Sequence, residues 1–192
     1  LSLAKVIAKM KSLEHLELFQ NGISTKGMKE IFISLKENKN IKIIKVNDNC
    51  TKESIQSLIE FMPELKNLKI IDISDSLIGN KNGIEFFKTI SGMDGIEEVY
   101  CNYNEIEDKK AQKEIFEYIE KTKNIKVFEF KGNEVNKALF KQFENNLKNN
   151  LEKFECYSED EEEFEEEEKE EKDKEDKVDK LANEIDKINL NK

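Results

Sequence analysis

A short apolar ladder recurs along most of this 192-residue chain, and its period constrains the fold more than any other feature. The ladder has the form Leu-x-x-Leu-x-Leu-x-x-Asn-x-Ile, and successive copies begin 26 to 29 residues apart. Self-similarity at this period is typical of leucine-rich repeats, whose units cannot bury their apolar faces alone and must stack on their neighbours. The copies begin at Leu13, Ile41, Leu68, Ile96 and Ile125, with a truncated copy at Leu151.

Each repeat is predicted to contain one strand and one helix. Ladder positions one, four and six are apolar while positions three and five are mostly polar, which is the alternation of a strand with one buried face. The residues that follow carry apolar side chains at steps of three and four, which indicates an amphipathic helix. We therefore expect an α/β solenoid of the long, 27–29-residue, ribonuclease-inhibitor-like class, with parallel strands on the concave side and helices on the convex side. Strands are expected at residues 15–18, 43–46, 70–73, 98–101 and 127–130, and residues 151–156 are expected to cap the C-terminal end.

Charge and composition divide the chain into three segments. The repeats occupy residues 1–157, and residues 1–10 resemble the helix of a preceding repeat, so we expect further repeats upstream. The acidic segment covers residues 158–177, and its residues 159–176 hold 14 acidic side chains against three Lys in a chain of net charge −10. So dense a run cannot bury apolar surface, and we expect a disordered tail that either solvates the chain or contacts a basic partner. Residues 178–192 form a short amphipathic end.

The composition disfavours several classes of function. All 32 basic residues are Lys, so the chain cannot make the bidentate guanidinium contacts of many phosphate-binding and guanine-binding sites. Its net negative charge disfavours binding to nucleic acid. His15 is the sole histidine, no glycine-rich phosphate loop occurs, and the three Cys lack a Cys-x-x-Cys spacing. We therefore expect no enzyme centre, no metal and no cofactor. No apolar run of about 18 residues is present, so membrane insertion is not expected. The chain is predicted to be a binding scaffold.

Polar side chains at odd ladder positions should line the concave side, and the loops after the strands should join them at one edge. The candidate partner-binding residues are Glu17, Phe19, Asn47, Asp48, Asp72, Asp75, Glu98, Tyr100, Asn102 and Glu129.

The last segment carries large apolar residues at intervals similar to those of leucine-rich nuclear export signals. These residues are Val178, Leu181, Ile185, Ile188 and Leu190. A helix that caps the solenoid and a chance match are the alternative interpretations of this spacing.

In their order and spacing, the repeats resemble the later repeats of the Ran GTPase-activating protein family. The resemblance rests on residues 19–23, 46–49, 75–78, 102–106 and 131–133, and on the acidic tail that follows them. It implies a GTPase activator that binds the small GTPase Ran in its GTP form and stimulates hydrolysis without an arginine finger, in nucleocytoplasmic transport. It also implies a cytoplasmic protein, shuttling or at the nuclear envelope, with a Ran-binding protein or an exportin as further partners. The activating Asn of that family lies in an earlier repeat, so it is assigned to no residue of this chain.

Other interpretations stay open. An acidic leucine-rich repeat scaffold of the histone-chaperone or inhibitor type, with no role on a GTPase, would also end in an acidic tail, but its repeats are shorter, about 22 to 25 residues. A ribonuclease-inhibitor-like scaffold with an unrelated ligand would fit the repeat length. An enzyme would need catalytic residues upstream of this sequence.

Overall fold

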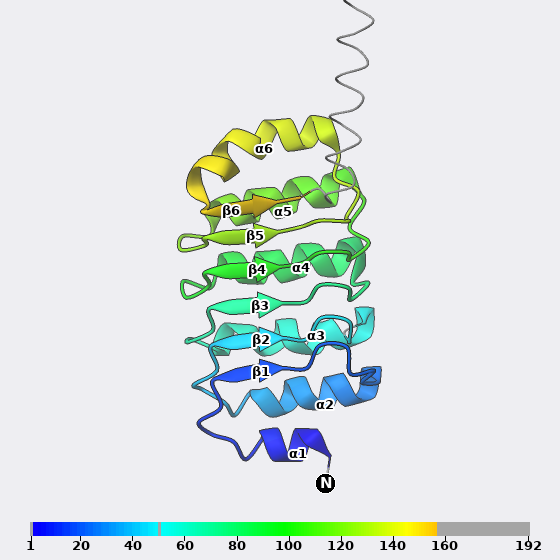
Figure 1. Cartoon of the computed structure of the whole chain (residues 1–192), viewed down its shortest axis with the longest axis vertical. Coiled ribbons are helices and arrows are strands. Elements are labelled where there is room, and N and C mark those ends of the chain that lie inside the picture. The colour runs from blue at the N-terminus through cyan, green and yellow to red at the C-terminus, as the bar shows by residue number, and fades with distance from the viewer. Residues whose placement is uncertain (1, 50, 157–192) are drawn as a thin grey trace, which may run out of the picture. The chain divides into compact units, whose positions relative to one another are not determined.

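The computed structural model of the chain describes residues 2–49 and 51–156, and its strands form one six-stranded parallel sheet with helices along one face (Figure 1). The strands are β1 (His15–Glu17), β2 (Ile43–Lys45), β3 (Ile70–Asp72), β4 (Glu98–Tyr100), β5 (Val127–Glu129) and β6 (Lys153–Glu155). The helices are α1 (Leu3–Ile7), α2 (Thr25–Leu35), α3 (Lys52–Phe61), α4 (Gly79–Ser91), α5 (Lys109–Lys121) and α6 (Lys137–Asn150), with a 3-10 turn η1 (Met62–Glu64) after α3. The acidic segment and the C-terminal segment lie outside the described residues.

The strands pair in chain order and in the register that the ladder predicts. His15 lies opposite Ile43, Ile43 opposite Ile70, and Ile70 opposite Glu98, so equivalent ladder positions form rows across the sheet. The α/β architecture with parallel strands and one helix per repeat is thereby confirmed. Each strand ends one residue earlier than expected, because the chain turns into the strand-to-helix loop at the next ladder position. The expected cap at residues 151–156 contains β6, which adds one more parallel strand to the sheet.

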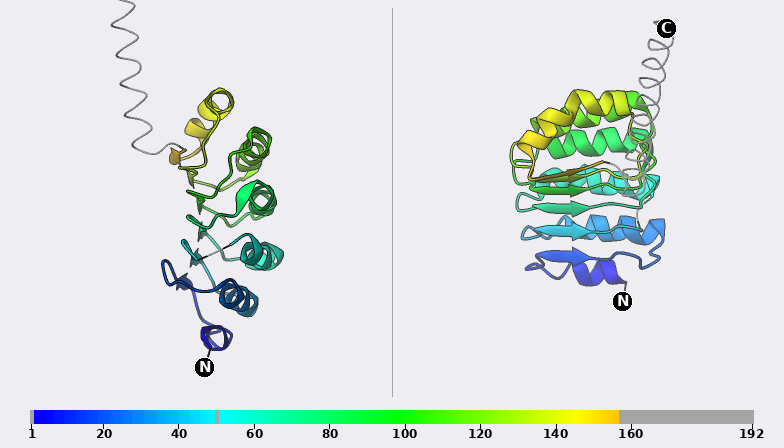
Figure 2. Two further views of the ribbon diagram at one scale, coloured as in Figure 1. Left: turned by 90° about the vertical axis from the view of Figure 1, so that its right-hand side faces the viewer. Right: turned by 45° about the horizontal axis from the view of Figure 1, so that its top comes forward.

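The strands and the helices occupy opposite sides of the repeats (Figure 2). Neighbouring helices stand further apart than neighbouring strands, so the strand side is the inner side of a curve. The apolar ladder positions and the apolar helix stripes face each other between these two layers. Leu16, Ile44, Ile71, Val99 and Phe128, all at ladder position four, are buried there.

Aromatic side chains fill the C-terminal half of this core. The ring of Phe116 lies 5.9 Å from the ring of Phe130 and 5.6 Å from that of Phe143, and the ring of Phe128 lies 5.5 Å from that of Phe87. The first and third of these pairs are edge-to-face, an arrangement that stabilises a core beyond the burial of its area. Cys101 and Cys156 are buried at ladder position six, as small apolar residues would be.

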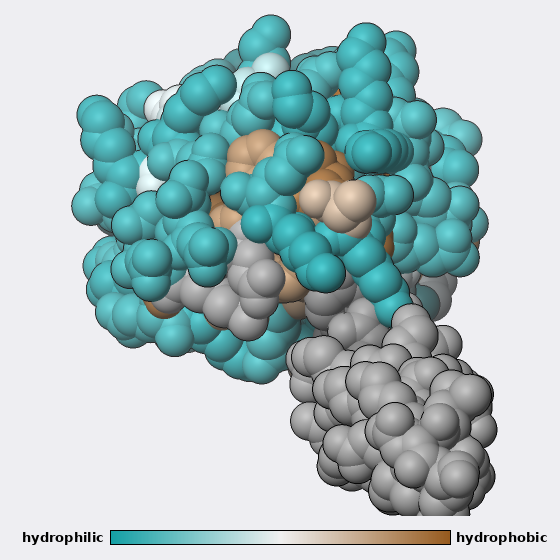
Figure 3. Space-filling view, turned by 90° about the horizontal axis from the view of Figure 1, so that it is seen from above, coloured by the Kyte–Doolittle hydropathy of each residue, from teal (hydrophilic) through white to brown (hydrophobic). Residues whose placement is uncertain are grey.

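The two ends of the repeats differ in exposed apolar surface. At the N-terminal end Leu3, Val6 and Met10 are exposed. In the next repeat the equivalent positions are Ile31, Ser34 and Asn38, and all three are buried. The C-terminal end is mostly hydrophilic, with a small apolar patch near its centre (Figure 3). That further repeats precede α1 stays a prediction.

Asn49, Asn104 and Asn133 close the turn after their strands and tie their repeats to the preceding one. Nδ2 of Asn104 donates to the carbonyl of Ile73 at 3.0 Å, and Oδ1 of Asn104 accepts from the amide of Ser76 at 3.2 Å. Asn133 makes the equivalent bond from Nδ2 to the carbonyl of Cys101 at 2.9 Å. Both neighbours of such an Asn have a left-handed backbone, with φ of +52° at Tyr103 and +55° at Glu105.

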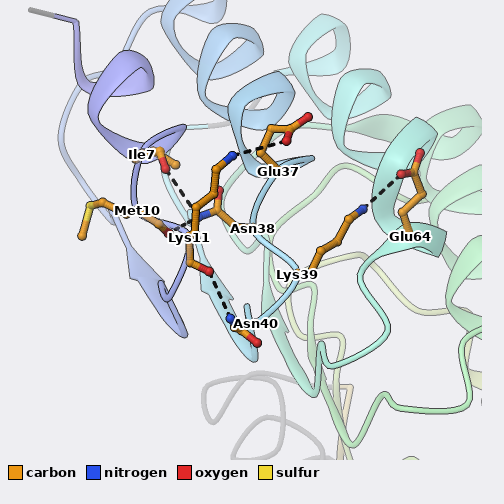
Figure 4. Close-up of polar contacts among 8 residues, drawn as sticks. All are labelled: Ile7, Met10, Lys11, Glu37, Asn38, Lys39, Asn40 and Glu64. Carbon is orange, nitrogen blue, oxygen red and sulfur yellow. Dashed lines mark hydrogen bonds and ion pairs between the residues drawn. The ribbon is translucent and has the colours of Figure 1, made fainter.

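A second set of polar links joins the repeats at the helix-to-strand loops (Figure 4). Nδ2 of Asn38 donates to the carbonyls of Ile7 and Met10, and Nδ2 of Asn40 donates to the carbonyl of Lys11 at 3.0 Å. These bonds join the loop after α2 to carbonyl groups at and beyond the end of α1, and those of Ile7 and Met10 also accept backbone amides in their own repeat. Exposed ion pairs lie at the same edge, Lys11–Glu37 and Lys39–Glu64, each at 3.3 Å.

Candidate partner-binding surface

The side of the sheet that faces away from the helices presents two rows of side chains, which the strand register aligns. We call these rows the sheet face. The first row contains His15, Ile43, Ile70, Glu98, Val127 and Lys153. The second row contains Glu17, Lys45, Asp72, Tyr100, Glu129 and Glu155.

The C-terminal half of the sheet face is a connected polar network. Oε2 of Glu129 accepts from Nδ2 of Asn102 at 3.1 Å, and Oε1 of Glu129 accepts from Lys153. Lys131 forms an ion pair with Glu155, and Lys153 lies 3.2 Å from the same carboxylate. Glu129 is 9% exposed, so its charge depends on these partners. The network therefore holds these side chains in one arrangement.

Tyr100 of β4 lies opposite Glu129 in the sheet, next to this network. Its hydroxyl donates to Oε2 of Glu98 at 2.7 Å. Burial raises the pKa of Tyr100, and the hydrogen bond to Glu98 raises it further, so the phenol stays a donor at neutral pH.

The N-terminal half of the sheet face is simpler. Ile43 and Ile70 are half-buried side by side, and the pair Lys45–Glu17, 3.6 Å apart, borders them. This half therefore has an apolar centre with charged side chains around it.

The loops that follow the strands form one continuous edge. The amide of Gln20 donates to the carbonyl of Asn47, and the amide of Asp48 donates to the carbonyl of Ser74 at 3.0 Å. Asp75 lies on this edge, where burial raises its pKa and the carboxylates of Asp48 and Asp72 add to the effect. The edge therefore concentrates negative charge.

The structure places the candidate residues from the sequence in two adjoining groups. Glu17, Asp72, Glu98, Tyr100 and Glu129 lie on the sheet face. Phe19, Asn47, Asp48, Asp75 and Asn102 follow the strands at the loop edge. Their contact with a partner stays a prediction. The proposed export residues Val178, Leu181, Ile185, Ile188 and Leu190 lie outside the described residues.

Two members of the network were missed in the sequence. Lys153 and Glu155 hold Glu129 and Lys131, yet neither was proposed as a surface residue. The signal was present, because these residues stand at positions three and five of the truncated ladder that begins at Leu151. The short ladder was interpreted as a cap instead of a full strand.

The sheet face combines hydrogen-bonded and ion-paired side chains with a small apolar area. Within residues 2–49 and 51–156, no group of three or more His, Cys, Asp and Glu is placed to hold a metal ion. Helices in the same part of the chain are too short or too polar to span a membrane.

Comparisons with known proteins identify the fold and not a sequence family. No protein-family model matches the sequence, and no curated protein matches it significantly. Among solved structures, the chain is similar to a tropomodulin C-terminal domain from Caenorhabditis elegans, with a TM-score of 0.65 and 9% identity over 77% of this chain and 92% of that one. It is also similar to actin-binding site 2 of leiomodin-1, with a TM-score of 0.63 and 10% identity over 77% of this chain and 86% of that one. At such low identity the likeness shows the fold alone.

These findings correct the interpretation drawn from the sequence. The predicted membership of the Ran GTPase-activating family is wrong, since the structural neighbours are a tropomodulin domain and a leiomodin actin-binding site, and no sequence comparison supports the family. The associated predictions of Ran in its GTP form as partner, with a Ran-binding protein or an exportin, and of a role in nucleocytoplasmic transport, fall with it.

Proposed function

We propose that this chain is a protein-binding module of the leucine-rich repeat type whose partner is actin. The observation that carries the proposal is the structural likeness to the actin-binding site of leiomodin-1 over 77% of the chain. We also infer that its repeats belong to the long, ribonuclease-inhibitor-like class, since they recur every 26 to 29 residues with one helix each.

The sheet face is the surface that we assign to actin. A rigid sheet holds its side chains at fixed spacing, and the network around Glu129 keeps the polar groups oriented. Ile43 and Ile70 supply a central apolar area bordered by charged groups, which is the usual arrangement of a specific interface. The helices, by contrast, cover the core, and we assign no partner to their exposed side.

The test measures binding of the full chain to fluorescent monomeric actin and co-sedimentation with actin filaments. The face variant is Glu17→Lys, and the control is Glu30→Lys on the helix side. Both side chains are exposed, and both variants change the charge by the same amount. We expect the face variant to weaken binding about tenfold or more, and the control to bind as the parent does. Failure of the parent chain to bind either form of actin would refute the proposal.

The cytoplasmic location stays a proposal as well. A fluorescent fusion of the full chain, imaged with and without Ala at Ile185, Ile188 and Leu190, would test it together with the export signal.

A further inference from the structure

Leu77 occupies a position that is unfavourable in two ways. Its side chain is 56% exposed, and its backbone has a left-handed φ of +50°. A left-handed backbone is unfavourable for a residue that carries a side chain. The turn imposes it at equivalent positions of other repeats as well, at Gly22 with φ of +58°, at Glu105 with +55° and at Glu134 with +46°. The feature particular to this repeat is therefore the large apolar side chain at an exposed position, which burial does not explain.

Two other large side chains are exposed on the same loop edge. Phe19 is 52% exposed in the first repeat, and Tyr103 is 47% exposed in the repeat that follows Leu77. The loops of Leu77 and Tyr103 are joined directly, because the amide of Asp75 donates to the carbonyl of Asn102 at 2.9 Å. Tyr103 is also held in place, since its ring packs so closely over Gly132 that a Cβ there would lie 2.1 Å from Cδ1 of the ring.

Carboxylates stand on the same edge of the repeats as these apolar side chains. Asp48, Asp75, Glu105 and Glu134 are exposed on the same loops, and Lys52 pairs with Glu105 at 3.0 Å. We call Phe19, Leu77 and Tyr103, with these four acidic residues, the loop strip. Rigid apolar and aromatic side chains with charged neighbours are the usual energetic centres of protein interfaces.

We propose that the loop strip is a second binding surface, separate from the sheet face, that receives a basic amphipathic helix of a partner protein. The Lys or Arg residues of such a helix would face the carboxylates, and its apolar stripe would cover Phe19, Leu77 and Tyr103. The spacing supports a helix, because neighbouring repeats lie about 4.8 Å apart at their strands and one helical turn rises about 5.4 Å. Side chains at positions i and i+4 of the partner therefore meet successive loops.

The probe is a fluorescent 14-residue helical peptide of Leu and Lys, titrated with the full chain by anisotropy. The strip variant combines Phe19→Ser with Leu77→Asn, and the control is Ile33→Asn, which removes an equally exposed apolar side chain, 64% exposed, from α2. Every variant keeps the acidic residues 159–176, so attraction of the peptide to that segment is common to all. We expect the strip variant to bind about tenfold more weakly or worse and the control to match the parent.

A second variant tests the charges. Asp48→Asn with Asp75→Asn should weaken binding at low salt and flatten its dependence on ionic strength. Thermal unfolding completes the test, because Leu77→Asn should leave the melting temperature unchanged or raise it. Equal affinities of the parent and the strip variant would overturn the proposal, and so would a fall in melting temperature of several degrees, which would show that Leu77 serves the fold.

Discussion

At the scale of single residues, the turn after each strand determines how the repeats join. Asn104 is completely buried and bonds through its side chain to Ile73, Ser76 and Asn102. An amide can donate twice and accept as well, so one Asn serves backbone groups of two repeats at once. The residues on either side of the Asn adopt a left-handed backbone. Gly132, which precedes Asn133, lies so close to the ring of Tyr103 that no side chain fits there.

Replacing Asn104 by Ala should lower the free energy of unfolding by about 2–3 kcal/mol, because several buried backbone groups lose their partners. Asn21 is the matched control, since it stands at the same ladder position but is exposed and bonds only to Phe19 in its own loop. Asn21→Ala should change stability by about 0.5 kcal/mol or less. Urea unfolding followed by circular dichroism measures both, and equal losses would contradict the role given to Asn104.

Gly132→Ala should destabilise the chain more than Gly22→Ala. Both residues have a left-handed φ, so each substitution costs about 1 kcal/mol or more in backbone strain. Around Gly22 a Cβ would meet open space, whereas at Gly132 it would enter the ring of Tyr103. The excess should disappear in a Tyr103→Ala background, which a double-mutant cycle of melting temperatures can show. An excess that persists there would assign the cost to something other than the ring.

At the scale of elements, ion pairs link the beginnings of neighbouring strands. Glu97, just before β4, lies 2.6 Å from Nζ of Lys69 and 2.8 Å from Nζ of Lys126. Hydrogen bonds from Lys126 and Lys69 lower the pKa of Glu97 from 4.5 to about 2. The two ion pairs of Glu97 therefore tie β4 to β3 and to β5 for as long as the carboxylate is charged.

This lowered pKa predicts a pH dependence of stability. Because the folded chain holds Glu97 ionised more strongly than the unfolded chain does, its contribution is complete above about pH 4.5 and is lost as the pH falls toward 2. Glu97→Gln should therefore reduce the fall in urea midpoint between pH 5 and pH 2.5. Glu60→Gln, at an exposed carboxylate of α3, serves as the control. An unchanged pH slope in Glu97→Gln would show that the ion pairs do not contribute.

At the scale of the described repeats as a whole, each unit packs mainly on its immediate neighbours, as the order β1 to β6 of the sheet shows. Stability in such an array is close to a sum of repeat and interface contributions, and the ends open most easily. α1 is five residues long and leaves Leu3 and Val6 exposed, so the N-terminal end has the weakest packing support.

Hydrogen exchange should reveal this gradient. We expect amides of α1 to exchange fastest among the helices and those of β2 to β4 slowest, because the interior strands have a neighbour on both sides. Mass spectrometry of peptides after timed labelling measures the order. Uniform protection from α1 to α6 would show that the repeats open as a single cooperative unit instead.

The candidate site was only partly predictable. The rows on the sheet face followed from ladder positions three and five, so the placement of Glu17, Asp72, Glu98 and Tyr100 could be anticipated from the sequence. The placement of Lys153 and Glu155 could also have been inferred from the truncated ladder, but the bonds that join them and Asn102 in the network around Glu129 depend on side-chain directions that residue type does not determine. The predicted Ran partner was wrong because the motifs behind the resemblance consist largely of ladder and turn residues. Stacking of the repeats requires such residues whatever partner the solenoid binds.

The sequence by itself determined the repeat unit, the parallel strand order, the buried ladder and the absence of guanidinium chemistry, because period and residue type act locally and recur in every repeat. Only the tertiary structure decided which side chains meet across repeats and which stay exposed. Leu77 illustrates the difference, since it stands at a variable ladder position for which the sequence predicts neither burial nor exposure, and the left-handed turn exposes it. Contacts between repeats depend on how each loop directs its side chains, and that direction is set by the hydrogen bonds of the neighbouring loop and not by the residue alone.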